Sequence, residues 1–135
     1  MQLPWRSLKR CAPAWLMPYA VRLRDDGWIT EVPDQAIINE YAPGQGITRH
    51  VDCVPCFGDI ILSISLNSAC VMTFTRIVEP IEVPLLLRPR SLTIMRGESR
   101  YGWTHGIMAR KTDNYMGESI TRGRRLSITF RRVIV

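Results

Sequence analysis

The chain has 135 residues, of which 46% are hydrophobic and 22% charged. This length fits one domain with one core, and the apolar content excludes an intrinsically disordered chain. The formal net charge of +6 and the sequence pI of about 9.6 favour a polyanionic partner such as DNA or RNA, although some arginines can instead bind a small dicarboxylate. With no run of about 18 apolar residues and no signal-peptide pattern, we expect an intracellular, cytoplasmic protein (nuclear if eukaryotic) that enters no membrane.

The first predicted element is a helix over residues 12–26. Its apolar residues recur at the i, i+3 and i+4 spacing of one helix face: Trp15, Leu16, Tyr19, Ala20 and Leu23. Pro18 lies inside this pattern, so the helix either kinks there or starts there with proline in its first turn. Gly27 is the predicted C-cap. We expect this helix to pack on the outside of a sheet.

Beyond the helix the sequence predicts only short strands. They are rich in Ile, Val, Leu, Thr and Phe and are separated by turn residues: Gln35–Tyr41, Asp59–Leu66, Ala69–Thr75, Glu82–Leu87, Ser91–Arg96 and Arg124–Val133. One helix cannot supply the crossovers of a parallel sheet, so we expect a mainly β fold, an antiparallel sandwich or jelly roll. Residues 110–125 are polar and contain two glycines, which predicts a surface loop before the last strand.

The stretch with the clearest chemical potential is His50-Val51-Asp52. In extended backbone, residues i and i+2 point to the same face, so an imidazole nitrogen and a carboxylate oxygen can reach one metal ion. The chain has one other histidine, His105. Two histidines and one carboxylate on one face of an octahedral ion form the ligand set of non-haem Fe(II) oxygenases.

Two cysteines follow directly in the pattern Cys53-x-x-Cys56. Such a pair can be a redox couple or half of a zinc site. No second C-x-x-C follows, so a closed zinc site would also need His50 or His105. We interpret the pair as reduced thiols beside the metal-binding strand.

The last strand has two unlike faces. With period two, its polar residues share one face (Arg125, Ser127, Thr129 and Arg131) and its apolar residues share the other (Leu126, Ile128 and Phe130). Arginine is almost never buried unless it is paired, and its planar fork suits a carboxylate. The polar face therefore either binds a dicarboxylate or is solvated and basic.

Taken together, these motifs resemble AlkB-type dioxygenases, which use Fe(II), 2-oxoglutarate and O2. The resemblance covers about residues 12–133 and is carried, in the family's order, by Asn39-x-Tyr41, a P-G-x-G turn at 43–46, His50-x-Asp52, G-E-S-R-Y-G-W-T-H-G-I at 97–107 and R-x-S-x-T-F-R at 125–131. The amino-acid sequence of residues 32–35 and 97–107 is most similar to that of the catalytic domain of the tRNA-modifying AlkB homologue. The resemblance implies a double-stranded β-helix, a jelly roll of two facing sheets with the metal between them.

The resemblance also implies roles for individual residues. His50, Asp52 and His105 would bind Fe(II). The other implied contacts are with 2-oxoglutarate: Arg125 at its distal carboxylate, Arg131 near its other end and near Asp52, and Asn39 and Tyr41 as hydrogen-bond donors. Ser127 stands where the family often has asparagine, and this shorter side chain would reach the cosubstrate only through water.

The implied function is hydroxylation or oxidative demethylation of alkylated nucleic acid. Residues 1–11 are expected to be a short segment in which the family's nucleotide-recognition lid is absent or truncated, with residues 12–135 forming the dioxygenase domain. Val54 replaces an aspartate that reads the damaged base in some DNA-repairing members. Substrate recognition would then use other residues (Arg49, Arg76, Arg96, Arg100, Tyr101, Trp103 or the 110–124 loop) or a partner chain. Two alternatives are the same chemistry on a protein or small molecule, and a non-catalytic jelly-roll binding module.

Overall fold

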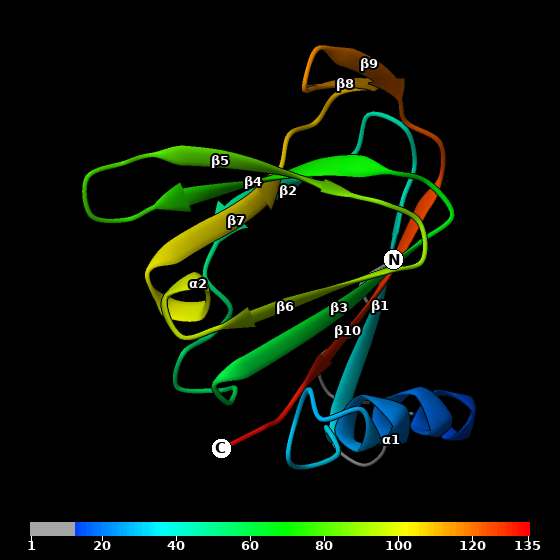
Figure 1. The fold of residues 1–135 in the computed structure, drawn as a ribbon, viewed down its shortest axis with the longest axis vertical. Helices are drawn as coiled ribbons and strands as arrows, with labels where there is room; N and C mark the ends of the chain where they lie inside the picture. The colour runs from blue at the N-terminus through cyan, green and yellow to red at the C-terminus, as the bar shows by residue number, and fades with distance from the viewer. Residues whose placement is uncertain (1–12) are drawn as a thin grey trace.

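The computed structural model describes residues 13–135, in which two four-stranded antiparallel sheets face each other (Figure 1). In spatial order, the first sheet contains β1 (Gln35–Tyr41), β10 (Arg125–Arg131), β3 (Ile60–Leu66) and β6 (Ser91–Arg96). The second contains β2 (Ile47–His50), β7 (Trp103–Ile107), β4 (Cys70–Arg76) and β5 (Glu82–Leu87). Successive strands thus alternate between sheets for much of the chain, and the predicted mainly β jelly roll is confirmed.

The strand predictions agree closely with the structure. Three strands have the predicted bounds, namely β1, β5 and β6, and the ends of β3, β4 and β10 shift by at most two residues. In the first sheet alternation accounts for this success, because one face of its strands packs toward the helix and the other faces the second sheet. Val133, the predicted end of the last strand, instead forms an isolated bridge with Phe57.

The helix begins with a short 3-10 turn, η1 (Ala14–Leu16), and continues as α1 (Met17–Asp25). Pro18 lies in the first turn of α1, so the start at proline is confirmed and the kink is not needed. The C-cap is Asp26, one residue before the predicted Gly27; Gly27 follows it with a φ of +84°, which favours glycine, and its amide donates to the Arg24 carbonyl at 2.9 Å. In the described residues, no helix is long and apolar enough to cross a membrane.

One face of this helical segment packs on the outer face of the first sheet (Figure 1). Buried residues of the helical segment and of the sheet form one hydrophobic cluster. The helical segment contributes Leu16, Ala20 and Leu23, the loop after it contributes Ile29, and the sheet contributes Ala36, Leu62, Ile128 and Phe130. Trp15 and Tyr19, which the periodicity assigned to the same face, are instead 59% and 55% exposed. Because the helix covers the apolar face of β10, the polar face of that strand is directed between the sheets.

Residues 110–125 are not the surface loop that we predicted. They contain a hairpin of β8 (Thr112–Tyr115) and β9 (Glu118–Thr121). Asp113 is fully buried and accepts hydrogen bonds from Arg122 Nε at 2.7 Å and Nη2 at 2.8 Å. The Val71 amide and Arg110 also donate to it, at 3.1 and 2.9 Å. The prediction was wrong because a buried ion pair within a polar segment leaves no hydrophobic pattern. The predicted N-terminal segment, residues 1–11, lies outside the described residues.

Candidate active site

The two histidines are brought together by the pairing of β2 with β7. His50 and His105 are register partners across these strands, and their ring centroids lie 4.4 Å apart. The strands can approach closely because Gly106 faces Arg49: a Cβ at Gly106 would lie 2.9 Å from the Arg49 Cα. Glycine at this position therefore sets the spacing between the two imidazoles.

Asp52 lies just beyond β2 and completes the group. Its Oδ1 is 3.3 Å from the Nε2 atom of each histidine. Potential ligand atoms of His50, Asp52 and His105 all lie within 4.8 Å of one another. Asp52 and His105 are 8% and 7% exposed, so the cluster is sheltered and yet opens to a cavity.

Contacts behind the cluster orient its members. The Nδ1–H of His50 donates to the Thr48 carbonyl at 2.8 Å, which leaves Nε2 free to bind a metal. The hydrogen bond with Asp52 raises the pKa of His50 above its ordinary value. Because the same nitrogen, Nε2, would bind a metal ion, proton and metal compete for this position.

The second carboxylate oxygen of Asp52 is held by an arginine. Arg131 Nη1 donates to Asp52 Oδ2 at 3.0 Å, and its Nε donates to Gln35 Oε1 at 2.9 Å. The Arg131 guanidinium also stacks 3.9 Å above the Phe57 ring. Burial by itself raises the pKa of Asp52, but the hydrogen bonds from both histidines and the charge of Arg131 outweigh it and hold the pKa well below its usual range. Asp52 is therefore ionised at neutral pH.

A cavity of about 450 Å³ lies between the sheets beside this cluster. All eight residues that we predicted as site residues line it: Asn39, Tyr41, His50, Asp52, His105, Arg125, Ser127 and Arg131. Apolar residues of both sheets complete the wall, among them Ile61, Met72, Leu87 and Met95. All eight strands of the two facing sheets thus contribute to a single chamber.

Arg125 is the least satisfied group in this chamber. It is 3% exposed, and its Nη2 donates to Ser65 Oγ at 2.8 Å. Its Nε is the one buried side-chain nitrogen or oxygen without a hydrogen-bond partner in residues 13–135. Its guanidinium lies 5.3 Å from the centre of the Tyr41 ring. A buried cation with an unused donor fits an anionic ligand, since a carboxylate accepts from guanidinium bidentately.

The residues fit the Fe(II) and 2-oxoglutarate that the sequence suggested. Two imidazole nitrogens and one carboxylate oxygen form the donor set of a non-haem Fe(II) centre. The cavity is large enough for a small ligand, and the buried Arg125 supplies the charge that a dicarboxylate requires. The zinc alternative has no support among the described residues, because neither cysteine of the C-x-x-C pair joins a metal-binding cluster.

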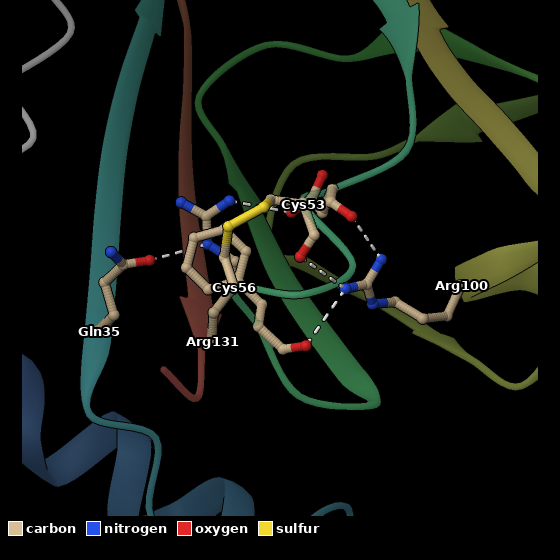
Figure 2. The surroundings of a disulfide bond; sticks show 7 residues. Gln35, Cys53, Cys56, Arg100 and Arg131 are labelled. Carbon is tan, nitrogen blue, oxygen red and sulfur yellow. Dashed lines mark hydrogen bonds and ion pairs between the residues drawn. A yellow bond between two sulfur atoms is a disulfide. The ribbon is translucent and has the colours of Figure 1, made fainter. Parts of the chain in front are cut away.

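The thiol prediction was wrong. Cys53 and Cys56 form a disulfide bond, shown in Figure 2, and Cys53 lines the cavity. The bond lies in the loop between Asp52 and β3, where the amides of Cys56 and Phe57 both donate to the Cys53 carbonyl. This tight turn brings the two sulfur atoms together, and sequence spacing alone could not distinguish it from a pair of free thiols.

The predicted substrate-recognition residues differ in accessibility. Arg100 is 2% exposed and binds backbone carbonyls, so its role in contacting substrate was a wrong prediction. Arg49 and Tyr101 are exposed, and Arg76 lies 6.0 Å from the centre of the Trp103 ring. Gln35 and Phe57, which we did not predict as site residues, both contact Arg131. The V-P-D-Q segment, already noted as family-like, was the available signal for Gln35.

The chain belongs to the 2OG-Fe(II) oxygenase superfamily, whose family model matches residues 6–131. Within that superfamily it is of the AlkB type. It is 44% identical over 128 residues to the mouse (Mus musculus) protein named tRNA (carboxymethyluridine(34)-5-O)-methyltransferase ALKBH8, a match covering 83% of this chain and 19% of that protein. It is 33% identical over 144 residues to the Arabidopsis thaliana protein named alkylated DNA repair protein ALKBH8 homolog, covering 90% of this chain and 42% of that protein. The chain thus spans less than half the length of either relative.

A solved structure supports the fold. The structure of OsALKBH1 superimposes with a TM-score of 0.54 and 21% sequence identity, covering 87% of this chain and 60% of that chain. At this identity the similarity concerns the jelly-roll architecture.

Proposed function

We propose that residues 12–135 form an Fe(II)- and 2-oxoglutarate-dependent dioxygenase domain that hydroxylates or oxidatively demethylates alkylated nucleic acid. The observation that carries the proposal is the His50, Asp52 and His105 cluster, whose ligand atoms lie within 4.8 Å of one another beside a cavity that contains buried Arg125. A non-catalytic module has no need of three convergent metal ligands together with a buried unpaired cation.

In this mechanism His50, Asp52 and His105 would hold Fe(II). When bound, Fe(II) and 2-oxoglutarate couple the O2-dependent decarboxylation of 2-oxoglutarate to hydroxylation of a substrate C–H bond. Arg131 and the two histidines keep Asp52 ionised and turned toward the metal. The hydrogen bond from His50 Nδ1 to Thr48 directs Nε2 into the cluster.

The same cavity orients the cosubstrate. Arg125, which is buried, would pair with its distal carboxylate, and Tyr41, whose pKa is raised by burial, would donate a hydrogen bond to it. Asn39 faces Ser127 across the β1–β10 pair, so both reach the space between the two arginines of β10. The apolar wall excludes bulk water from the reacting atoms.

Charge and relatives support nucleic acid as the substrate. The chain has a formal net charge of +6, and the names of its relatives refer to tRNA and to repair of alkylated DNA. Arg49, which precedes His50 in β2 and also pairs with Glu82 at 3.5 Å, and Tyr101, four residues before His105 and 42% exposed, provide an exposed cation and a stacking surface. Each phosphate contact made by such residues should add to the salt dependence of binding.

The decisive experiment begins with anaerobic reconstitution using Fe(II) and 2-oxoglutarate, followed by absorption spectroscopy for the metal-to-ligand charge-transfer band. Methylated DNA, RNA and tRNA oligonucleotides are then added with O2, and succinate and modified base are quantified. A charge-transfer band and base oxidation establish the proposal. Absence of both the band and succinate refutes it and favours a binding module.

The salt dependence of binding separates the substrate classes. A nucleic-acid enzyme should bind oligonucleotides with an affinity that falls steeply as salt is raised. Succinate formation without salt-sensitive oligonucleotide binding or base oxidation would favour a protein or small-molecule substrate instead.

A further inference from the structure

Arg100 lies at the end of a short helix, α2 (Glu98–Tyr101), just before the His105 strand, and its side chain reaches back to the loop at residues 52–58 (Figure 2). It donates from Nη1 to the Asp52 carbonyl at 2.8 Å and from Nε to the Gly58 carbonyl at 3.2 Å. Nη2 contacts the carbonyls of Cys53 and Phe57 at 3.4 and 3.5 Å. One side chain thus holds both ends of the loop.

This arginine is buried without a carboxylate. It is 2% exposed, and in residues 13–135 it forms no ion pair. Its charge is therefore compensated by the carbonyl dipoles of the loop and by the Tyr101 ring, 4.7 Å from the guanidinium carbon. Displacing those carbonyls would leave a buried charge unsatisfied, so the guanidinium strongly favours one loop conformation.

Asp52 is consequently fixed at two points. Arg100 holds its backbone carbonyl, and Arg131 holds its carboxylate through Oδ2 at 3.0 Å. The loop that follows is further closed by the Cys53–Cys56 disulfide and by Phe57, which stacks against Arg131. Figure 2 shows the two arginines approaching the loop from opposite sides. The rotation of Asp52 about its own backbone is thereby restricted.

We propose that Arg100 is a positioning residue for the metal centre: by holding the carbonyls of residues 52–58, it fixes the direction in which Asp52 presents Oδ1 to the metal. This inference rests on the proposed function. Arg100 itself is directed away from the reacting atoms, because its donors are used on the loop backbone. The short spacing between Arg100 and His105 links the positions of two ligands, since α2 leads directly into β7.

The test compares the full chain with Arg100→Gln and Arg100→Lys. Anaerobic titration with Mn(II), followed by the electron paramagnetic resonance signal of free Mn(II), measures the affinity of the ligand cluster without turnover. Loss of a contact behind a metal ligand typically costs about 10–100-fold in affinity, and we expect this loss for Arg100→Gln. Lysine keeps the charge but lacks the planar fork, so Arg100→Lys should be intermediate.

Arg122→Gln is the matched control. Arg122 is also buried, at 6% exposure, and also donates to a backbone carbonyl, that of Met108 at 2.7 Å, but it fastens the β8–β9 hairpin. The Arg122→Gln substitution should lower the melting temperature without changing the affinity for Mn(II). Equal losses of affinity in Arg100→Gln and Arg122→Gln would show general loosening and overturn the positioning role.

Wild-type Mn(II) affinity in folded Arg100→Gln would also overturn the positioning role of Arg100. If Arg100→Gln does not fold, unchanged Mn(II) affinity in Arg100→Lys would overturn that role instead. Failure of the proposed function is distinguishable, because wild-type protein would then bind Mn(II) weakly or form no succinate.

Discussion

Arg125 makes opposite contributions to stability and to ligand binding, which Arg125→Met should separate. The native guanidinium is 3% exposed, has one hydrogen bond to Ser65 and leaves Nε unpartnered. Replacing a buried charge by an apolar side chain of similar length is often neutral or stabilising by about 1–4 kcal/mol. For a domain of this size, each kcal/mol shifts the melting temperature by about 3–6 °C. The ligand-free variant should therefore melt at the same temperature as wild type or several degrees higher.

The effect on 2-oxoglutarate should have the opposite sign. A bidentate guanidinium–carboxylate pair comprises two charge-assisted hydrogen bonds, each contributing about 1.5–3 kcal/mol. Losing both weakens binding by about 3–6 kcal/mol, which is roughly 10²–10⁴-fold in Kd. Arg125→Lys, which retains the charge without the fork, should lose roughly half of that free energy.

Thermal unfolding of Mn(II)-loaded protein over a series of 2-oxoglutarate concentrations measures both quantities. Wild type should be stabilised by about 2.7 kcal/mol when 2-oxoglutarate is at 100 times its Kd. Arg125→Met should show no such shift over the same range. A variant that is strongly destabilised without ligand, yet retains wild-type affinity for 2-oxoglutarate, would refute the assignment of Arg125 to the cosubstrate.

Three further outcomes are expected. His50→Ala should abolish the charge-transfer band and succinate formation, whereas Arg24→Ala on the outer helix should leave both unchanged; a band in His50→Ala would contradict the metal assignment. Burial alone raises the pKa of Asp113, but hydrogen bonds, chiefly from Arg122, hold its folded pKa below the unfolded value of about 3.9. The ionised Asp113 therefore contributes its full stabilisation above about pH 3.9, and this stabilisation is lost as the pH falls through the folded pKa. Urea unfolding should accordingly find Asp113→Asn less stable than wild type at neutral pH and less sensitive to acid, and equal acid sensitivity would count against this account. Gly106→Ala forces a Cβ against the backbone of Arg49 and should cost about 1–3 kcal/mol while weakening Mn(II) binding; an unaltered variant would show that the strands can separate freely.

The sequence predicted most of the fold because its elements are governed by local patterns. Alternation in β10 divided its residues between helix-covered and cavity-lining faces, and Pro18 and Gly27 marked the ends of α1. The periodicity failed for Trp15 and Tyr19, since a helix on a sheet buries a narrower stripe than the apolar pattern suggested.

For the site, the predicted residues line one cavity, but the contacts that hold them were not predictable. The Asp113–Arg122 pair and the Arg100 clamp join residues 9 and 48 positions apart through polar atoms, for which the sequence has no periodic signal. Burial of an arginine depends on carbonyls whose direction is set by the tertiary fold. Likewise, thiols and a disulfide share the same C-x-x-C spacing, and the local turn decides between them.

The register pairing of His50 with His105 has a consequence for how the metal centre is assembled. The hydrogen bonds that align β2 and β7 also align the two imidazoles, so the ligands are already ordered once the sheet has formed. In zinc fingers, by contrast, metal binding supplies the free energy of folding. Here the metal-free protein should be a preassembled receptor, in which an ion can be loaded, lost or exchanged while the polypeptide keeps its fold.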